Sequence, residues 1–454
     1  MSNLSRDVLY MLFELLQDDK NTLYSCLLVN RTWCEIIIPI LWRNPWKFSK
    51  KKDRLSSVII LHLSNVSRNK IGNHNLLTNS YQKPSLNYIK YCKHLDLNEI
   101  HKMFCKESFI KILNEILSLF INKNMKFTHL YIHQKFGKIN LIHGAESCFS
   151  RIEFLSFSSD INDTILSKLI ETCKSIKKLE LIIRANNHNY RVVKLIEAQK
   201  KLFNVCLVPL RNNDPFRNIL ENSLVKHANT IQYFKITERP TTNILSSFVN
   251  LKGLEIDSDY YFNSEWKCLK NLSLFSLQIL KTSRVPINPL TDLIKNTNGF
   301  LFEIIIDDIH HNEVDNKRII QAISQNCSNL KYLKLFVRSN NIVEFETLLI
   351  NCQYLKGVYI LLSDNYFKWG KLFKILTKSS STSLFRFKFN LLPRIKSLKW
   401  FFDNWKGRHP MFLQFIKELE YMEEDLIGLV EKYKVEGVVK KFDIGCYYQD
   451  FEWI

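Results

Sequence analysis

Histidine and carboxylate residues, which often carry chemistry in proteins, recur in this chain without forming a recognisable site. His129 and His133 stand four residues apart on a segment that alternates polar and apolar residues, a pattern typical of a strand. The rise of a strand separates two such residues by about 13 Å, which is too far for a shared metal ion. The pairs His310-His311 and Asp307-Asp308 lie in a polar loop and at a strand end, where we expect ordinary solvated side chains. The chain has no GxxxxGK[ST], HExxH or GxSxG motif, so the sequence predicts no enzyme, no cofactor and no metal site.

The 11 cysteines are scattered from Cys26 to Cys446, and no two of them form a CxxC pair. This distribution excludes the usual zinc-ribbon and RING spacings and favours reduced thiols, in the cytoplasm, the nucleus or both. We expect no catalytic thiol among them. The cysteines of the central region are instead expected to fill small buried positions where a helix meets a strand.

The elements that would position functional residues follow a repeat with the template L-x-x-L-x-L, at a period of about 24–32 residues. Its clearest copies each begin three residues after a cysteine (Cys173, Cys327 or Cys352), and they are Ile176-Leu179-Leu181, Leu330-Leu333-Leu335 and Leu355-Val358-Ile360. The weaker copies are Phe127-Leu130-Ile132, Ile152-Leu155-Phe157, Leu202-Val205-Leu207, Ile231-Phe234-Ile236, Leu251-Leu254-Ile256, Leu269-Leu272-Leu274, Leu301-Ile304-Ile306 and Leu384-Phe387-Phe389.

Helical patterns separate these copies, for example Ile165-Leu166-Leu169-Ile170 and Phe345-Leu348-Leu349. One strand and one helix per unit predict an α/β fold, an irregular leucine-rich-repeat solenoid of horseshoe shape. The asparagine that this repeat usually carries three residues after its last apolar position is absent. The residues found there instead are Asp160, Arg184, Asp259 and Arg338.

Side chains beside the apolar positions are expected to line the concave face of the sheet, because a strand alternates its two sides. They are His94, Asp96, His129, Tyr131, His133, Phe154, Tyr233, Lys235, Phe275, Tyr332, Phe336, Tyr359 and Arg386. Aromatic residues and arginine dominate the energetics of protein–protein interfaces. The aromatic members are therefore our candidates for binding a protein: Tyr131, Phe154, Tyr233, Phe275, Tyr332, Phe336 and Tyr359.

The ends of the chain depart from the repeat, which gives four expected segments. Residues 49–90 are polar and lysine-rich and would form a linker or N-terminal cap, before a first strand near Leu95-Asp96-Leu97. The solenoid itself would cover residues 91–400. In residues 401–454 we expect a long amphipathic helix from Pro410, through Leu413, Ile416, Leu419, Leu426 and Val430, followed by a last strand, Val439-Phe442-Ile444. This pair would cap the open end of the array.

The first 48 residues predict three short helices rich in apolar residues. Ser5 is placed to cap the first, and the polar segment 17–21 separates it from the second. The third contains Trp33 and is expected to weaken by Ile38, because the residue before a proline is biased away from helix. A unit this small cannot cover all its apolar surface by itself, so part of that surface should face another part of this chain or a partner.

This segment resembles an F-box, and in particular the F-boxes of large, expanded fungal families. The most specific part is the string Leu28-Val29-Asn30-Arg31-x-Trp33, with Ile40-Leu41-Trp42 after it. The family's usual proline after the first leucine is Ser5 here. The resemblance implies that the following residues contact the Skp adaptor: Leu4, Val8, Leu9, Leu12, Leu16, Leu27, Val29, Trp33, Leu41 and Trp42.

The resemblance also implies a role. The chain is expected to be a substrate-recognition subunit of an SCF (Skp–cullin–F-box) ubiquitin ligase, which binds the Skp adaptor, and through it cullin, by residues 1–48. The solenoid would bind a protein substrate. The alternative is a leucine-rich-repeat scaffold with a degenerate F-box and no part in ubiquitination.

The formal charge of +20 and the apolar content also limit the classes of partner. A basic chain attracts nucleic acid and anionic membranes without any specific site. The lysines are spread along the chain together with many Asn, Ile and Phe residues, so we attribute the charge to composition and expect no specific nucleic-acid partner. No apolar stretch approaches the ~18 residues that span a bilayer, and the first residues lack the features of a secretory signal.

Overall fold

The structure is a computed structural model of the 454-residue chain, in which the chain divides into two compact units, residues 1–216 and 217–454. The structure describes residues 4–47, 52–70, 84–105, 109, 111–133, 144–184, 189–209, 215–258, 266–308, 311–362, 367–416 and 424–445. Asp259, His310 and Cys446 lie outside these ranges.

The first unit begins with three helices, α1 (Arg6–Leu15), α2 (Lys20–Cys26) and α3 (Arg31–Trp42). A polar side chain caps the start of each helix by accepting a backbone N–H, as expected for Ser, Asp and Asn. The distances are 3.3 Å at Ser5, 3.2 Å at Asp19 and 2.9 Å at Asn30. Ser5 therefore begins α1 without the proline that is usual in F-boxes.

The third helix continues through Pro39 to Trp42, so the prediction that it weakens by Ile38 was wrong. A proline inside a helix removes one backbone hydrogen bond and disfavours the preceding turn. Here the residues around it, Ile36, Ile37, Ile38 and Ile40, are all buried. Their packing offsets the local cost of the proline.

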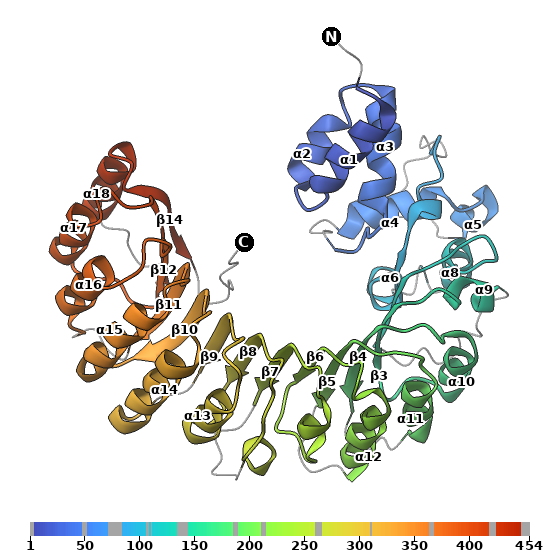
Figure 1. The fold of residues 1–454 in the computed structure, drawn as a ribbon. Coiled ribbons are helices and arrows are strands. Elements are labelled where there is room, and N and C mark those ends of the chain that lie inside the picture. The colour runs from blue at the N-terminus through green and yellow to red at the C-terminus, as the bar shows by residue number, and fades with distance from the viewer. Residues whose placement is uncertain are drawn as a thin grey trace. The chain divides into compact units, whose positions relative to one another are not determined.

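The remainder of the first unit alternates helices with parallel strands that pair in sequence order (Figure 1). Its strands are β1 (His94–Asp96), β2 (His129–Ile132), β3 (Phe154–Ser158), β4 (Lys178–Ile183) and β5 (Asn204–Pro209). The helices are α4 (Lys52–Leu61), α5 (Asn65–Asn69), α6 (Leu97–Phe104), α8 (Leu113–Phe120), α9 (Ala145–Phe149), α10 (Asp163–Thr172) and α11 (Tyr190–Glu197), with the short 3-10 helix η1 (Ile89–Tyr91). Helix α12 (Pro215–Ser223) contains the division between the units.

The second unit repeats the same arrangement, again with parallel strands in sequence order. Its strands are β6 (Tyr233–Ile236), β7 (Gly253–Asp257), β8 (Ile279–Ser283), β9 (Glu303–Asp307), β10 (Tyr332–Val337), β11 (Gly357–Leu362), β12 (Arg386–Phe389), β13 (Met411–Ile416) and β14 (Val439–Gly445). Its α-helices are α13 (Ile287–Lys295), α14 (Glu313–Asn326), α15 (Ile342–Asn351), α16 (Trp369–Lys378), α17 (Ile395–Asp403) and α18 (Glu424–Val435). Short 3-10 helices are η2 (Leu224–His227), η3 (Ile244–Ser247), η4 (Lys267–Leu269) and η5 (Ser339–Asn341).

The L-x-x-L-x-L template locates the strands correctly except at one copy, Leu269-Leu272-Leu274, which is wrong. In that repeat the strand is β8. The buried positions of the template are Leu277, just before the strand, and Leu280 and Thr282 within it. The last position is a threonine, whose hydroxyl donates to Ile305 O at 3.4 Å, so the apolar template did not match it. Every apolar position of the other copies is buried, which places the core between the sheet and its helices.

The helix expected from Pro410 was wrong in its first part, because residues 411–416 form strand β13. In its later part Leu426 and Val430 do lie on a helix, α18, and are buried, while Leu419 lies outside the described residues. Leu413 and Phe415 pair with Phe387 and Phe389 of β12, and the strand buries Met411 with them at period two. Strand β14, at the expected last copy, continues the same sheet.

One backbone pattern joins the strands of each unit, and we call it the edge ladder. The carbonyl just before one strand accepts the N–H of the equivalent residue before the next strand, and usually that of the residue after it. Lys331 O, for example, accepts Lys356 N at 2.8 Å and Gly357 N at 3.2 Å. These bonds satisfy backbone groups that would otherwise be buried without partners at the strand entrances.

Side chains satisfy the backbone at the other ends of several strands. Asn316 is fully buried, accepts Arg338 N at 3.1 Å and donates to Phe336 O at 2.7 Å. Asn98 and Ser159 accept His133 N and Arg184 N in the same way, at 2.6 and 3.0 Å. Arg184 and Arg338 stand at two of the positions where the consensus asparagine was expected, and Ser159 and Asn316 bond their backbone N–H groups.

The cysteines that precede the clear repeat copies are buried where a helix ends, as predicted. Cys173 and Cys352 each donate a thiol hydrogen bond at 3.4 Å to the carbonyl of the preceding repeat, on Phe149 and Cys327. Burial raises their pKa values to about 11 and about 12. These thiols are therefore protonated and structural.

Candidate interaction surfaces

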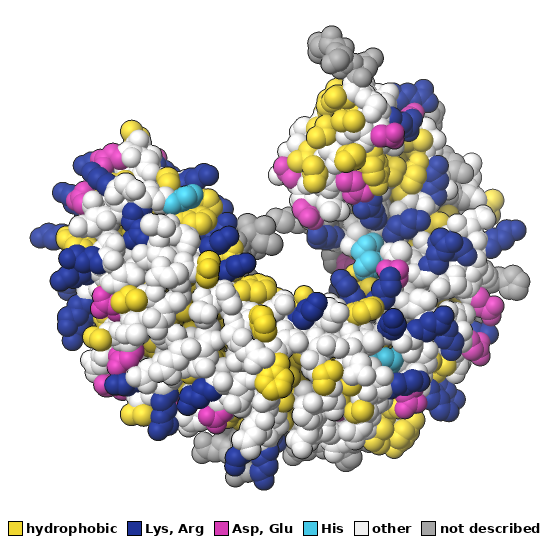
Figure 2. Space-filling model, in the orientation of Figure 1, with side chains coloured by type: hydrophobic (Ala, Val, Ile, Leu, Met, Phe, Trp, Pro, Cys, Tyr) yellow, Lys and Arg dark blue, Asp and Glu magenta, His cyan; other side chains and the backbone are white. Residues whose placement is uncertain are grey.

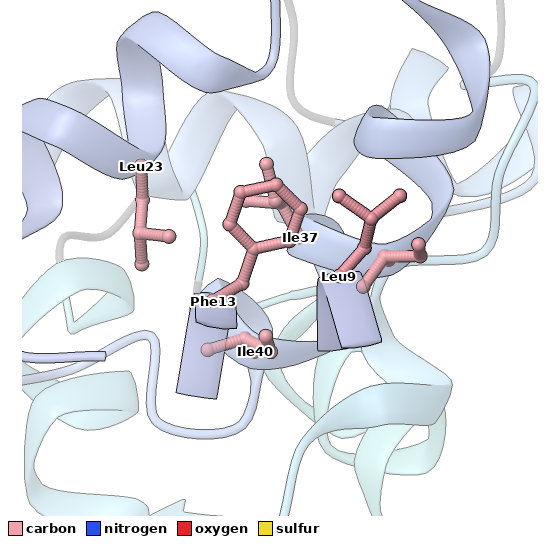
Figure 3. Close-up of a cluster of buried hydrophobic side chains, with 6 residues drawn as sticks. Leu9, Phe13, Leu23, Ile37 and Ile40 are labelled. Atoms are coloured by element: carbon pink, nitrogen blue, oxygen red, sulfur yellow. The ribbon is translucent and has the colours of Figure 1, made fainter. Parts of the chain in front are cut away.

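Helices α1–α3 enclose a small core of their own, formed by Leu9, Phe13, Leu23, Ile36, Ile37 and Ile40 (Figure 3). Trp33 packs its ring edge-on against Phe13 at 5.0 Å between ring centroids. Leu16, Leu27 and Leu41 cover the margin of this cluster. The core fixes which side of each helix faces outward.

The outward side of α1 is apolar. The large side chains exposed along it recur at helical spacing, and they are Leu4, Val8, Met11, Leu12 and Leu15. Leu15 is 83% exposed, and in the connection between α2 and α3 Leu28 is 88% exposed, beside the exposed Val29. We call these residues the apolar stripe; Figure 2 shows hydrophobic side chains on this part of the surface. Monomeric proteins rarely leave such contiguous apolar surface uncovered, so the stripe is a candidate binding site for another protein.

The residues predicted to contact an adaptor divide into three groups. Leu4, Val8, Leu12 and Val29 belong to the stripe. Leu16, Leu27, Trp33 and Leu41 are partly buried against the core, and Trp42 stacks on Tyr88 at 5.2 Å. Leu9 is buried in the core, which corrects its assignment as a contact residue, because it can only support the stripe from beneath.

Met11 and Leu15 also belong to the stripe but were not among the predicted contact residues. The signal was present in their spacing of three from Val8 and Leu12, which puts all four on one helix face.

A polar cluster beside the stripe ties α1 to the end of α3. Arg43 donates from Nη1 to Glu14 Oε2 at 3.1 Å and makes a second, shorter contact through Nη2. Tyr10 donates its hydroxyl to Glu14 Oε1 at 2.5 Å. The hydrogen bond from Arg43 lowers the pKa of Glu14, and that from Tyr10 adds to this shift, so the carboxylate stays ionised.

The same end of α3 is joined to the first strand by backbone hydrogen bonds. Arg43 O accepts Lys93 N at 2.9 Å and His94 N at 3.2 Å, which makes it the first acceptor of the edge ladder. Trp46 donates from Nε1 to His94 O at 2.6 Å, and the amide of Asn44 lies 3.2 Å from His94 Nδ1. Burial, with a contribution from His129, lowers the pKa of His94 to about 4, so its ring is neutral at pH 7.

The sheet face opposite the helices, called here the front face, carries aromatic rings in the first unit. His94 stacks on His129 at 3.7 Å between ring centroids, and His129 stacks on Phe154 at 5.3 Å. Tyr131 packs against Phe154 at 5.2 Å. His133 is bonded to Ser156 at 2.6 Å between Nε2 and Oγ. Tyr131 and Phe154 thus lie together and are partly exposed, as a binding face requires.

The front face of the second unit combines lysines with tyrosines. The ammonium groups of Lys334 and Lys388 lie 4.7 and 4.8 Å from the ring centroid of Tyr359, one on each neighbouring strand. Lys334 is also paired with Asp307. Tyr233 is exposed and its ring lies over Gly253, where an added Cβ would lie 2.5 Å from Tyr233 Cδ1. Only glycine leaves room for that ring position.

Three of the predicted front-face residues are placed differently from the expectation. Phe336 and Tyr359 are on the front face but buried, so they can form only the floor of a binding surface. Phe275 is exposed but lies in the turn before β8, because the strand itself begins at Ile279. Tyr332 is partly exposed on β10, as expected.

The parts of the chain that the structure describes contain no group of three or more His, Cys, Asp or Glu residues that could hold a metal ion. His311 is buried beside Asn316, 3.2 Å from its amide. Within the same described ranges, no helix is both long and apolar enough to cross a bilayer.

Parallel strands joined by helices, with template leucines inside, define a leucine-rich-repeat-like array that follows a three-helix unit. No protein-family model matches the chain, and no curated protein sequence matches it. Among solved structures, the chain is similar to the leucine-rich repeat-containing protein LegL7 from Legionella pneumophila. The identity is 10% and the TM-score 0.36, over 64% of this chain and 89% of that one.

Proposed function

We propose that the protein is a substrate-recognition subunit of an SCF-type ubiquitin ligase. Helices α1–α3 would bind the Skp adaptor, and through it cullin, by the apolar stripe, while the front face of the repeats binds a protein target. The observation that carries the proposal is the stripe itself, since it lies on the segment that resembles an F-box and is left uncovered by the described residues. The site of action would be the cytoplasm, the nucleus or both.

In this role the chain would contribute no covalent chemistry. It would hold a target lysine near a ubiquitin-conjugating enzyme carried elsewhere in the complex. Tethering of this kind raises the effective concentration of the reacting groups, which accelerates transfer without a catalytic residue on the receptor.

The test is binding of the full-length protein to purified Skp adaptor. The variant Val8→Ser/Leu12→Ser removes apolar area from the stripe without entering the core, and we expect at least a tenfold loss of affinity. The matched control, Val66→Ser/Val343→Ser, changes two exposed valines elsewhere and should leave affinity unchanged.

Absence of adaptor binding by the wild-type chain would reject the ligase role and favour the scaffold with a degenerate F-box. Binding that survives the stripe variant would show that the adaptor uses another surface.

A further inference from the structure

A row of cations and aromatic rings follows the edge ladder of β10–β14, and we call it the cation–aromatic edge. It consists of Lys331, Lys356, Phe385, Arg386, Phe412 and Lys440. Three hydrogen-bonded steps of the ladder fix the order from β10 to β13: Lys331 O accepts Lys356 N, Lys356 O accepts Phe385 N, and Phe385 O accepts Phe412 N. Lys440 of β14 lies beside Phe412. The three lysines are exposed, and the other members are partly exposed.

The four cations of this edge form no ion pair with a carboxylate in the described part of the chain, and Arg386 lacks acceptors as well. Its Nε and Nη1 atoms are buried without a hydrogen-bond partner among those same residues. A buried donor left without an acceptor is costly, and an ionised acceptor relieves that cost best. Elsewhere on the sheet, neighbouring charges are neutralised within the chain: Lys177 pairs with Glu153 at 2.8 Å and Lys281 with Glu303 at 2.9 Å.

The rings of the edge are already in contact with cations. The guanidinium of Arg386 lies 5.2 Å from the ring centroid of Phe385 and 5.5 Å from that of Phe412. Lys440 lies 5.7 Å from the same ring of Phe412, and His409 packs on Phe385 at 4.4 Å. A nucleic-acid base would need a free ring face for stacking. Carboxylates need only the cations, so a polypeptide acid fits this edge better than a base does.

The length of the edge limits the size of the ligand. Four strand intervals of about 4.8 Å separate β10 from β14, which gives about 19 Å. An extended peptide rises about 3.4 Å per residue, so about six residues cover this distance.

We propose that the cation–aromatic edge binds an extended acidic segment of a protein, about six residues long, with its carboxylates on Arg386 and the lysines. The inference rests on the proposed receptor function in one respect: the segment would belong to the target. Peptide binding itself does not require the adaptor.

The experiment uses the full-length chain and a fluorescein-labelled hexapeptide in which Glu alternates with Leu. Fluorescence anisotropy at low salt should show saturable binding, and the same peptide with Gln in place of Glu should not bind. The variant Lys331→Gln/Lys356→Gln/Arg386→Gln should weaken binding at least tenfold. Its matched control, Lys371→Gln/Lys374→Gln/Lys378→Gln, removes three exposed charges from α16 and should stay within twofold of wild type.

Equal losses in the edge variant and the α16 control would overturn the proposal, because the peptide would then sense only net charge. Tighter binding of an oligonucleotide than of the Glu peptide, lost in the edge variant, would assign the edge to nucleic acid instead. Peptide binding by a chain that does not bind the Skp adaptor would leave this inference standing while the ligase role fails.

Discussion

Leucine has opposite roles in two regions of this molecule. In the strands of the repeats, template leucines such as Leu333 are buried between the sheet and its helices. In α1, Leu12 and Leu15 point away from the core that Leu9 and Phe13 form. The repeats therefore bury their apolar residues within the chain, whereas α1–α3 leaves several of its apolar side chains exposed. This difference makes α1–α3 the candidate region for binding a partner.

The largest expected effect on the free energy of unfolding comes from replacing one leucine by alanine in the repeats and, for comparison, one in α1. Leu333→Ala should lower the free energy of unfolding by about 2–5 kcal/mol, because it leaves a cavity in the sheet–helix core. Leu15→Ala should change it by less than about 0.5 kcal/mol. Denaturant unfolding followed by circular dichroism measures both. Equal costs would mean that Leu15 is covered within the chain.

A smaller effect is expected from polar residues inside the repeats. Asn316→Ala should cost about 1–3 kcal/mol, because Phe336 O and Arg338 N would lose their partner in a buried place. The control Asn288→Ala removes an exposed amide whose oxygen accepts a hydrogen bond from Arg318 at 3.3 Å, and it should cost little. A cost below that of the control would show that water replaces Asn316.

The joint between α1 and α3 should respond to pH. Arg43 lowers the pKa of Glu14, so the pair stabilises the folded state above the unfolded pKa of about 4.3, and this contribution is lost as pH falls through the lower folded value. Both groups are partly exposed, so we expect about 1 kcal/mol. Glu14→Gln should remove this part of the pH dependence between about pH 5 and 3. The prediction would be wrong if the variant and the wild type lost the same stability as the pH falls.

The smallest effect, one of labelling and not of stability, concerns the thiols. At pH 7 a maleimide should label the exposed Cys105 rapidly, and should leave Cys173 and Cys352 unmodified in the folded chain. Mass spectrometry after proteolysis gives the extent at each site. Rapid labelling of Cys352 would indicate that its repeat opens readily.

The strands were predictable because their apolar residues alternate with a period that few other structures share. The two failures concern β8 and β13. Thr282 replaces an apolar residue in β8, and the spacing of Leu413 and Ile416 in β13 is also compatible with a helix. Period two along one strand is decided by the neighbouring strand, here β12, which the local pattern does not contain.

The binding surfaces were less predictable than the fold. Helix α1 is apolar on two sides, and only the positions of α2 and α3 decide that Leu9 turns inward while Val8 turns outward. Tyr359 is buried because lysines on both adjacent strands lie over its ring, a contact between residues that are far apart in sequence. The sequence pattern of a single helix or strand contains neither fact.

The carbonyl of Arg43 occupies the place in the edge ladder that a preceding strand would occupy. Rotation of α1–α3 about this junction would break two backbone hydrogen bonds and the bond from Trp46 to His94 O. A partner protein bound to α1 would therefore be held at a fixed angle to the rings of β1–β3. One residue inserted between Arg43 and Trp46 should therefore change that angle.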